Sequence, residues 1–327
     1  MISVALCTYN GAKYLGEQLE SILNQTRSVN EIVICDDRSS DATADIVKAF
    51  QDKAPFPIYF NRNDSQLGST KNFEKCLQLC QGDIIFLCDQ DDSWMPEKVE
   101  KLVYFLEKNP QQQMVFSNAG MMDEKSERIA GNIWQEVMFD DNMQKIWQAG
   151  GAAQILYKGY VVTGATVALR KSALDKMLPF PTSVKDLIHD AWMSISLALK
   201  NQIGFVNEEL ILYRRHSAQQ VGFGGNGVEA VSFKQRFSRP RAEKLLPIQE
   251  ELYRLESTLA LLKQHYPEVP ANQFAKLESH RDFVKFRLEL PENRLLRIFP
   301  VTLKFLTGKY YDPQKHWWKT LLGDIVE

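Results

Sequence analysis

Short apolar runs alternate with helical periodicity along the first 120 residues of the chain. Strands are predicted where apolar residues cluster, at residues 2–9, 31–37, 58–63, 83–89 and 113–119. Helices are predicted where apolar residues recur every three or four positions, at residues 11–25, 39–51, 69–82 and from Pro96 onward. This alternation predicts an α/β fold in which helices flank a mostly parallel, Rossmann-like sheet.

The pattern changes after Met122. Residues 131–151 have no clean period and contain Trp134 and Trp147. A long irregular segment of this kind predicts a lid, mobile without ligand, rather than part of the core. Regular patterns return as a strand and the start of a helix at 160–174, a helix at 186–202, and a bent strand or strand pair at 203–216.

A glycine-rich stretch at residues 222–227 predicts the end of the main domain. From Val228 onward the pattern is helical and is interrupted by prolines. The sequence therefore predicts a main domain at residues 1–222 and a C-terminal helical appendage at residues 228–327.

Composition narrows the class of protein. Of the 327 residues, 44% are hydrophobic and 24% are charged, as in ordinary soluble enzymes, and the net charge of −2 does not favour a nucleic-acid partner. The five cysteines contain no Cys-x-x-Cys pair, which predicts reduced thiols in the core. No apolar run reaches the roughly 18 residues of a membrane span, and the N-terminus does not read as a signal peptide. We therefore expect a cytoplasmic protein.

Polar side chains follow the first four predicted strands. These strand ends are residues 8–11, 36–39, 61–63 and 89–92. Ligands of open α/β sheets bind at the carboxyl ends of the strands, so these residues are the candidate site. The first strand is not followed by a glycine-rich phosphate loop, which argues against a dinucleotide-binding dehydrogenase, a P-loop enzyme or a nucleotidyltransferase.

Three carboxylates crowd the end of the fourth predicted strand, at Asp89, Asp91 and Asp92. One of them could cap the helix that starts at Pro96, but capping leaves the other two unexplained. Their mutual repulsion favours a bound cation, and Mg²⁺ or Mn²⁺ commonly joins such carboxylates to substrate phosphates. The cluster therefore predicts a metal site that binds phosphate through the metal.

Six stretches taken together resemble the family 2 glycosyltransferases of GT-A fold. They are VALCTYNGAKYLGEQLESILNQT, EIVICDDRSSDAT, GSTKNFEKCL, FLCDQDDSWMPEKVEKL, HDAWMSISLAL and LILYRRHSAQQV. The resemblance covers roughly residues 1–222, and the DQDDSW and HDAW motifs are most similar to those of bacterial rhamnosyltransferase-like members.

The resemblance implies an inverting, metal-dependent transfer of a sugar from a nucleoside diphosphate. The expected donor is dTDP-rhamnose, with a UDP-linked galactofuranose, glucose, galactose or N-acetylglucosamine as the alternative. The acceptor would be a hydroxyl of a growing cell-surface polysaccharide or a lipid-linked oligosaccharide. A non-catalytic nucleotide-sugar-binding protein is the alternative from another class.

The resemblance also implies site residues. Those expected to contact the nucleotide are Thr8, Tyr9, Asn10, Asp36, Asp37, Lys71, Asn72 and Asp89. Asp36 or Asp37 would accept a hydrogen bond from the imide of the base. Asp91, with Asp89 and His216, would hold the metal, and Asp92 could exchange places with either carboxylate.

The remaining implied roles concern the sugar, the diphosphate and the proton. Asp190 of the HDAW motif would be the general base that deprotonates the acceptor. It could instead cap the helix that follows, and its neighbour His189 is the less favoured base. Trp94 and Trp192 would contact the sugar. Arg214 and Arg215 would contact the diphosphate through their forked donors.

The C-terminal tail has a charge pattern of its own. Residues 281–319 contain nine Lys or Arg against four Asp or Glu, with aromatic residues between them. Basic and aromatic residues on short amphipathic helices suit the inner surface of an anionic membrane. The alternative is a helical appendage that packs on the main domain or on a second copy in a homo-oligomer. Trp317 and Trp318 are the aromatic residues expected to insert.

Overall fold

A computed structural model describes residues 1–216, 240–311 and 317–326. The chain divides into two compact units. The sheet unit comprises residues 1–137 and 160–220, and the helical unit comprises residues 138–159 and 221–327. The glycine-rich stretch predicted to end the main domain lies outside the described residues.

The first half of the sheet is parallel, as predicted. Its strand order is β3 (Ile58–Arg62), β2 (Glu31–Asp36), β1 (Ile2–Thr8) and β4 (Ile84–Cys88). Every residue of β2 and β4 is buried, which explains why these strands are continuous apolar runs rather than alternating ones. Their carboxyl ends meet at one edge of the sheet because all four strands run the same way.

The second half of the sheet is mixed. It adds β8 (Val167–Arg170), β6 (Met114–Met122), β9 (Ile203–Arg214) and β5 (Ser93–Trp94), with β7 (Arg128–Asn132) paired to β6. Strand β8 is antiparallel to both of its neighbours, whereas β6 and β9 are parallel. Because β8 is the reversed strand between β4 and β6, the strands β6 and β9 run in the same direction as β1 to β4. The sheet is therefore mostly parallel, as expected, with β8, β5 and β7 as its antiparallel strands.

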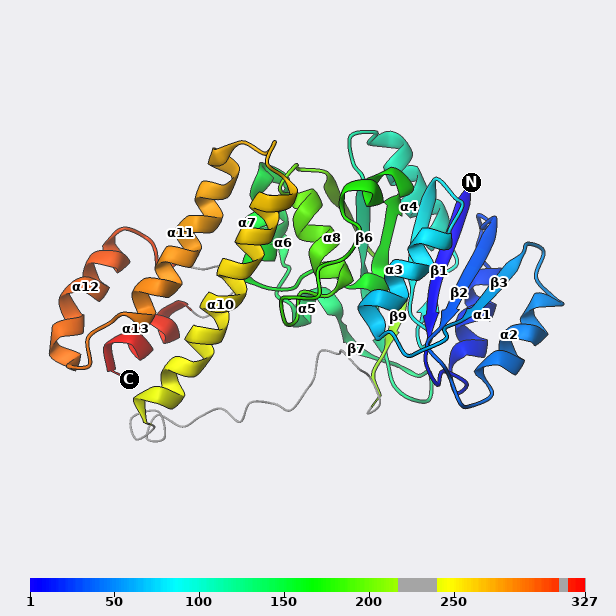
Figure 1. Cartoon of the computed structure of the whole chain (residues 1–327), viewed down its shortest axis with the longest axis horizontal. Helices are drawn as coiled ribbons and strands as arrows, with labels where there is room; N and C mark the ends of the chain where they lie inside the picture. Colours follow the sequence, from blue (N-terminus) through cyan, green and yellow to red (C-terminus); the bar gives the residue numbers. More distant parts are fainter. Residues whose placement is uncertain (217–239, 312–316, 327) are drawn as a thin grey trace. The chain divides into compact units, whose positions relative to one another are not determined.

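Helices with one apolar face flank the sheet (Figure 1). They are α1 (Leu15–Leu23), α2 (Thr43–Gln51), α3 (Ser69–Leu79), α4 (Lys98–Lys108) and α8 (His189–Ala198). Helix α8 differs from the others because nearly all of its residues are buried, so it has no exposed polar face.

The segment expected to be a lid is folded and packed. It forms α5 (Ile133–Glu136), α6 (Asp141–Ile146) and a π-helical turn (Trp147–Gly151). Trp134 is buried against Phe116, and Trp147 is buried against Phe139. The irregular lid is thus a wrong prediction, because two short capped helices escape a search for longer periodicity.

The helical unit confirms the predicted C-terminal helices. Its helices are α6, α7 (Ala152–Lys158), α10 (Arg241–His265), α11 (Ala271–Leu288), α12 (Arg294–Leu306) and α13 (Trp317–Val326). Helices α10 and α11 pack through buried residues such as Leu255 and Leu277. The Tyr157 hydroxyl of α7 donates to the Leu255 carbonyl at 2.6 Å, so residues 138–159 group with the later helices. Among the described residues, no helix has the length and apolarity to cross a bilayer.

Candidate active site at the carboxyl ends of the strands

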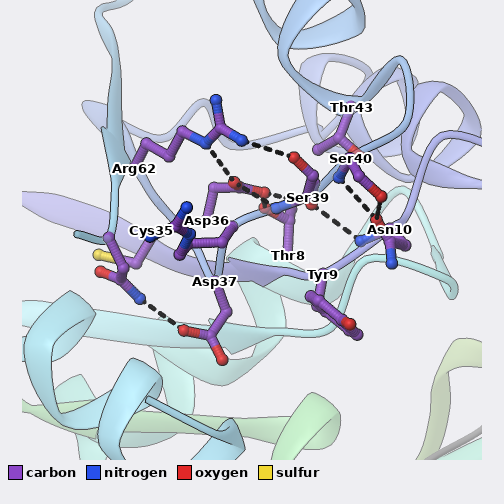
Figure 2. A network of polar contacts seen from close by, with 12 residues as sticks. Thr8, Tyr9, Asn10, Cys35, Asp36, Asp37, Ser39, Ser40, Thr43 and Arg62 are labelled. Atoms are coloured by element: carbon purple, nitrogen blue, oxygen red, sulfur yellow. Dashed lines mark hydrogen bonds and ion pairs between the residues drawn. The ribbon is translucent and has the colours of Figure 1, made fainter. Parts of the chain in front are cut away.

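Asp36 joins the carboxyl ends of β1 and β2 (Figure 2). The Thr8 hydroxyl donates to its Oδ1 at 2.8 Å, and the Ser39 backbone N–H donates to its Oδ2 at 2.9 Å. The Ser39 hydroxyl in turn accepts from the Asn10 backbone N–H at 2.8 Å, and Asn10 Oδ1 accepts from the Ser40 N–H. These contacts fix the first two strand ends against each other.

Asp37 holds the loop that leads into α3. Its Oδ1 accepts from Asn63 Nδ2 at 2.9 Å and from the Leu67 N–H at 2.7 Å, and its Oδ2 accepts from the Gly68 N–H at 2.9 Å. Asn63 Nδ2 also donates to Asn72 Oδ1, so Asn72 belongs to the same buried network. A carboxylate accepts about four hydrogen bonds, so Oδ2 of Asp37 retains capacity for a ligand donor.

Gln90 links the ends of β1 and β4. Its side-chain amide bonds both backbone groups of Tyr9, accepting from the N–H at 2.8 Å and donating to the carbonyl at 3.0 Å. A Cβ on Gly11 would lie 2.2 Å from Gln90 Oε1, so a larger residue there would displace the Gln90 side chain from Tyr9. The Tyr9 side chain is left exposed beside this clamp. Lys71 Nζ is held by Glu74 and by the Phe180 carbonyl.

The acidic cluster after β4 includes an Asp–His pair. Asp91 Oδ2 lies 2.8 Å from His216 Nε2, and both side chains are mostly buried. Asp92 is buried: its Oδ1 accepts from the Arg214 backbone N–H at 3.0 Å, and its Oδ2 has no partner among the described residues. Burial, and then Asp91 and Asp190, raise the pKa of Asp89 to about 7. Burial and the neighbouring carboxylates also raise the pKa of Asp92.

Arg214 is a correction to the sequence prediction. Its side chain is fully buried, with Nε donating to the Asp91 carbonyl at 2.7 Å and the guanidinium paired with Glu17 at 2.6 Å. It also donates to the Ser126 hydroxyl at 2.8 Å. Arg214 therefore braces the acidic loop from behind and is not free to contact a diphosphate. Arg215 is partly exposed and pairs with Glu136 at 3.2 Å.

The two tryptophans expected to contact the sugar are also corrections. Trp192 is buried in α8 and its Nε1–H donates to the Met177 carbonyl at 3.1 Å. Trp94 is buried against Phe86. Neither indole presents an open face, because motif proximity places a residue near a site without fixing which way its ring points.

Asp190 lies in the first turn of α8, at the second position after the N-cap residue Ile188, and no side chain forms a capping hydrogen bond at this helix start. Asp190 Oδ2 accepts from the Gly164 N–H at 2.9 Å, and Oδ1 accepts from the Ala191 N–H at 2.7 Å. His189 is buried and stacks on Phe73 with ring centroids 4.1 Å apart, and its burial lowers its pKa. This environment does not favour His189 as the base.

Sequence reasoning missed Lys98. Its side chain is fully buried, and Nζ donates to the Ala165 carbonyl at 2.6 Å and lies 3.8 Å from the centre of the Trp94 ring. Burial lowers its pKa to about 7, while Cys88 and the carboxylates of Asp92 and Asp89 oppose that shift. Its position in the sequence could have indicated this burial, because Lys98 lies on the apolar face of α4, four residues before Leu102.

Tyr213 shows that the predicted carboxylates gather around one place. Burial raises the pKa of its phenol, and the further causes are Asp92, Asp89, Asp91 and Asp190. The structure thus brings the DQDD and HDAW motifs together although about 100 residues separate them.

The acidic cluster provides two ligand atoms for a divalent cation, and substrate and water would have to supply the others. Within the described residues, no group of three or more His, Cys, Asp and Glu side chains is arranged to hold a metal. Asp91 and His216 form a pair of adjacent ligand atoms, and the buried, unpartnered oxygen of Asp92 lies in the same loop. Mg²⁺ and Mn²⁺ are commonly bound by one or two protein ligands together with substrate phosphates and water, so the residues present fit such an ion.

Comparisons with known proteins agree with this geometry. An uncharacterized glycosyltransferase of Nostoc sp. is 27% identical over 66% of this chain and 65% of its own length. A dTDP-rhamnosyl transferase of Shigella flexneri is 28% identical over 72% of this chain and 77% of its own length. The structure of Staphylococcus aureus TarS residues 1–349 with UDP-GlcNAc aligns with a TM-score of 0.52 and 17% identity, over 95% of this chain and 93% of that chain. At that identity the likeness concerns the fold.

The profile of glycosyl transferase family 2 matches residues 3–178, just over half of the sequence. This match covers β1 to β4, the Asp36 network and the acidic cluster. The chain therefore belongs to glycosyl transferase family 2 and has the GT-A fold expected from its motifs.

Proposed function

We propose that this protein is an inverting, metal-dependent glycosyltransferase that moves rhamnose from dTDP-rhamnose to a hydroxyl of a carbohydrate or lipid-linked acceptor. The observation that carries the proposal is the meeting of two acidic motifs. Asp89, Asp91 and Asp92 come from the end of β4, and Asp190 comes from the start of α8. A binding protein would need the first group only, whereas a transferase needs both.

The nucleotide would bind at the ends of β1 and β2. Thr8, Asn10 and Asp36 form a rigid floor there, and Tyr9 leaves its ring exposed above it. An imide N–H of thymine or uracil needs a fixed acceptor, and the carboxylate oxygens of Asp36 and Asp37 are both held in place.

A divalent cation would be held by Asp91 and His216, with Asp89 or Asp92 as the further carboxylate. Bound there, the cation would neutralise the charge of the diphosphate as it departs. Arg214 contributes indirectly, because it fixes the Asp91 carbonyl and so the direction of the Asp91 side chain.

Asp190 would act as the general base. The acceptor hydroxyl gives its proton to Asp190 while its oxygen forms a bond to the anomeric carbon. The bond from that carbon to the diphosphate oxygen breaks, and the diphosphate leaves with the electron pair. Attack opposite the leaving group inverts the anomeric configuration. The Gly164 N–H bond to Asp190 would orient the carboxylate for this task.

The donor is the least constrained part of the proposal. The Shigella relative supports dTDP-rhamnose through its name alone. UDP-linked sugars remain the alternative, and the neighbour that binds UDP-GlcNAc shares the fold at low identity.

A donor screen tests the function. The full chain is incubated with Mn²⁺ and each of dTDP-rhamnose, UDP-glucose, UDP-galactose, UDP-galactofuranose and UDP-N-acetylglucosamine, and released nucleoside diphosphate is measured by chromatography. We expect slow hydrolysis of dTDP-rhamnose that EDTA abolishes. Hydrolysis of one UDP-sugar instead would correct the donor. Tight binding of a nucleotide sugar, without hydrolysis or transfer to any acceptor, would favour the binding-protein alternative.

A further inference from the structure

Helix α12 of the helical unit exposes an unusual number of large apolar side chains. The most exposed are Phe299, Leu295 and Leu306, at 77%, 76% and 74%. Leu303 is also exposed. Leu295, Phe299, Leu303 and Leu306 follow one another at intervals of four, four and three residues, so they form one continuous face of the helix, here called the α12 stripe.

Helix α12 buries few of its apolar side chains. Its buried positions include Arg297 and Val301, and its apolar stripe faces outward. In an ordinary surface helix the apolar stripe faces the core. Scattered exposed leucines need no explanation, but a stripe along a whole helix indicates a surface that something covers.

Polar contacts hold α12 in this orientation. Arg297 donates through Nε to the Pro291 carbonyl and through a second nitrogen to the Glu292 carbonyl at 3.1 Å. Beneath the helix, buried Asp324 accepts from Arg287 Nε at 2.8 Å and from the Tyr310 hydroxyl at 2.8 Å. Val301 of α12 packs beside these groups in a small apolar cluster with Leu290 and Tyr310. Turning the stripe inward would remove Val301 from this cluster and would leave Arg297 without its partners.

The charges around the stripe indicate what covers it. Helix α12 has no Asp or Glu, and Arg294 and Lys304 lie within it, with Lys309 just after it. Exposed aromatic rings lie nearby in the sequence, at Tyr311 and at Trp318 of α13, which packs against α12 (Figure 1). Leucine and phenylalanine flanked by basic and amphipathic aromatic residues match the boundary between lipid headgroups and acyl chains.

We propose that the α12 stripe docks on the surface of an anionic lipid membrane. At about 1.5 Å per residue, a 13-residue helix is roughly 20 Å long, too short for the roughly 30 Å hydrocarbon core. It therefore lies in the plane of the interface. Of the two tryptophans expected to insert, Trp317 is partly buried in a stack against Phe305, whereas Trp318 is exposed and adds to the surface presented by α12.

The test is co-sedimentation of the full chain with phosphatidylcholine vesicles, with and without phosphatidylglycerol. We expect binding to the anionic vesicles that falls, without vanishing, as salt rises. Phe299→Ser combined with Leu303→Ser should lower the vesicle partition coefficient at least about tenfold. Tyr253→Ser, at another exposed aromatic ring on α10, is the control and should leave binding unchanged. Both variants should unfold at the wild-type temperature, because the changed side chains are exposed.

Two results would overturn the proposal. One is an absence of binding to anionic vesicles at low salt. The other is binding that the stripe substitutions do not alter. Analytical ultracentrifugation tests the alternative that a second copy of the chain covers the stripe. If the wild type is a dimer that Phe299→Ser dissociates, and if it does not bind vesicles, the stripe is an interface between two copies.

Discussion

Asp190 is the residue on which the proposed chemistry depends. Replacing it with Asn keeps an oxygen for the Gly164 N–H but removes the proton acceptor. We expect Asp190→Asn to lower turnover by roughly 10²–10⁴-fold, the usual effect of losing a general base, while the affinity for dTDP stays the same. Asp186→Asn, at an exposed position four residues earlier, is the control. Transfer assays and calorimetry on both variants decide the matter, and a loss of dTDP affinity in Asp190→Asn would assign the residue to the donor side.

His189 predicts a pH dependence of stability. Burial lowers the pKa of His189 in the folded protein below the ordinary value of about 6.5, which it keeps in the unfolded chain. At a pH between the folded and unfolded pKa, the unfolded chain therefore binds more protons than the folded protein. Stability contributed by neutral His189 is therefore complete above about pH 7 and is lost as the pH falls through 6.5.

We expect the free energy of unfolding to fall between neutral and mildly acidic pH, and to fall less in His189→Gln. Urea unfolding of both proteins at the two pH values gives the comparison. Equal pH dependence in wild type and variant would mean that another group is responsible.

The sequence motifs predicted which residues lie near one another where a motif fixes a backbone position, but they did not predict the hydrogen-bond partners of individual side chains. Asp91 and His216, far apart in sequence, were both expected at the metal and lie 2.8 Å apart. Arg214 could not be assigned in advance, since its partners Glu17 and Ser126 come from distant segments that no periodicity connects.

At the scale of elements, Lys98 ties α4 to the short 3₁₀ turn at Gly164–Thr166. Lys98→Met keeps the length of the side chain but removes the donor to the buried Ala165 carbonyl and a positive charge near Asp89 and Asp92. Leaving a buried acceptor unpaired costs about 1–3 kcal/mol, and we expect a loss of that size in the free energy of unfolding.

Lys101→Met is the matched control for Lys98→Met. Lys101 lies on the same helix and forms an exposed ion pair with Glu208, so its loss should change stability little. Denaturant unfolding of the two variants tests the contrast. Equal stabilities would show that Lys98 does not support the acidic loop.

The strands and longer helices were predictable because burial imposes a period on them. Strands β2 and β4 are buried along their whole length, and α1 to α4 each carry a regular apolar face. The short helices α5 and α6 were missed because a helix of one or two turns has too few positions for a period, and its caps are the only sign.

At the scale of the whole molecule, local pattern could not predict which segments group together. Residues 138–159 interrupt the sheet unit in sequence and belong to the helical unit by contact. Charge is also divided: carboxylates concentrate at the end of β4, whereas residues 281–319 carry the basic excess, so the net charge of −2 conceals two opposite regions. The carboxylates at the end of β4 suit a cation bound with its nucleotide, whereas the basic residues at 281–319 suit an anionic surface.

The most direct test of the account is calorimetric titration of dTDP into the full chain, with Mn²⁺ and with EDTA, for wild type and Asp91→Asn. If a metal joins Asp91 to the diphosphate, the affinity of the wild-type protein for dTDP should fall at least about tenfold when EDTA replaces Mn²⁺. The affinity of Asp91→Asn for dTDP should be weak both with Mn²⁺ and with EDTA. Wild-type affinity that is the same with Mn²⁺ and with EDTA, and unchanged in Asp91→Asn, would contradict the proposed metal-dependent site.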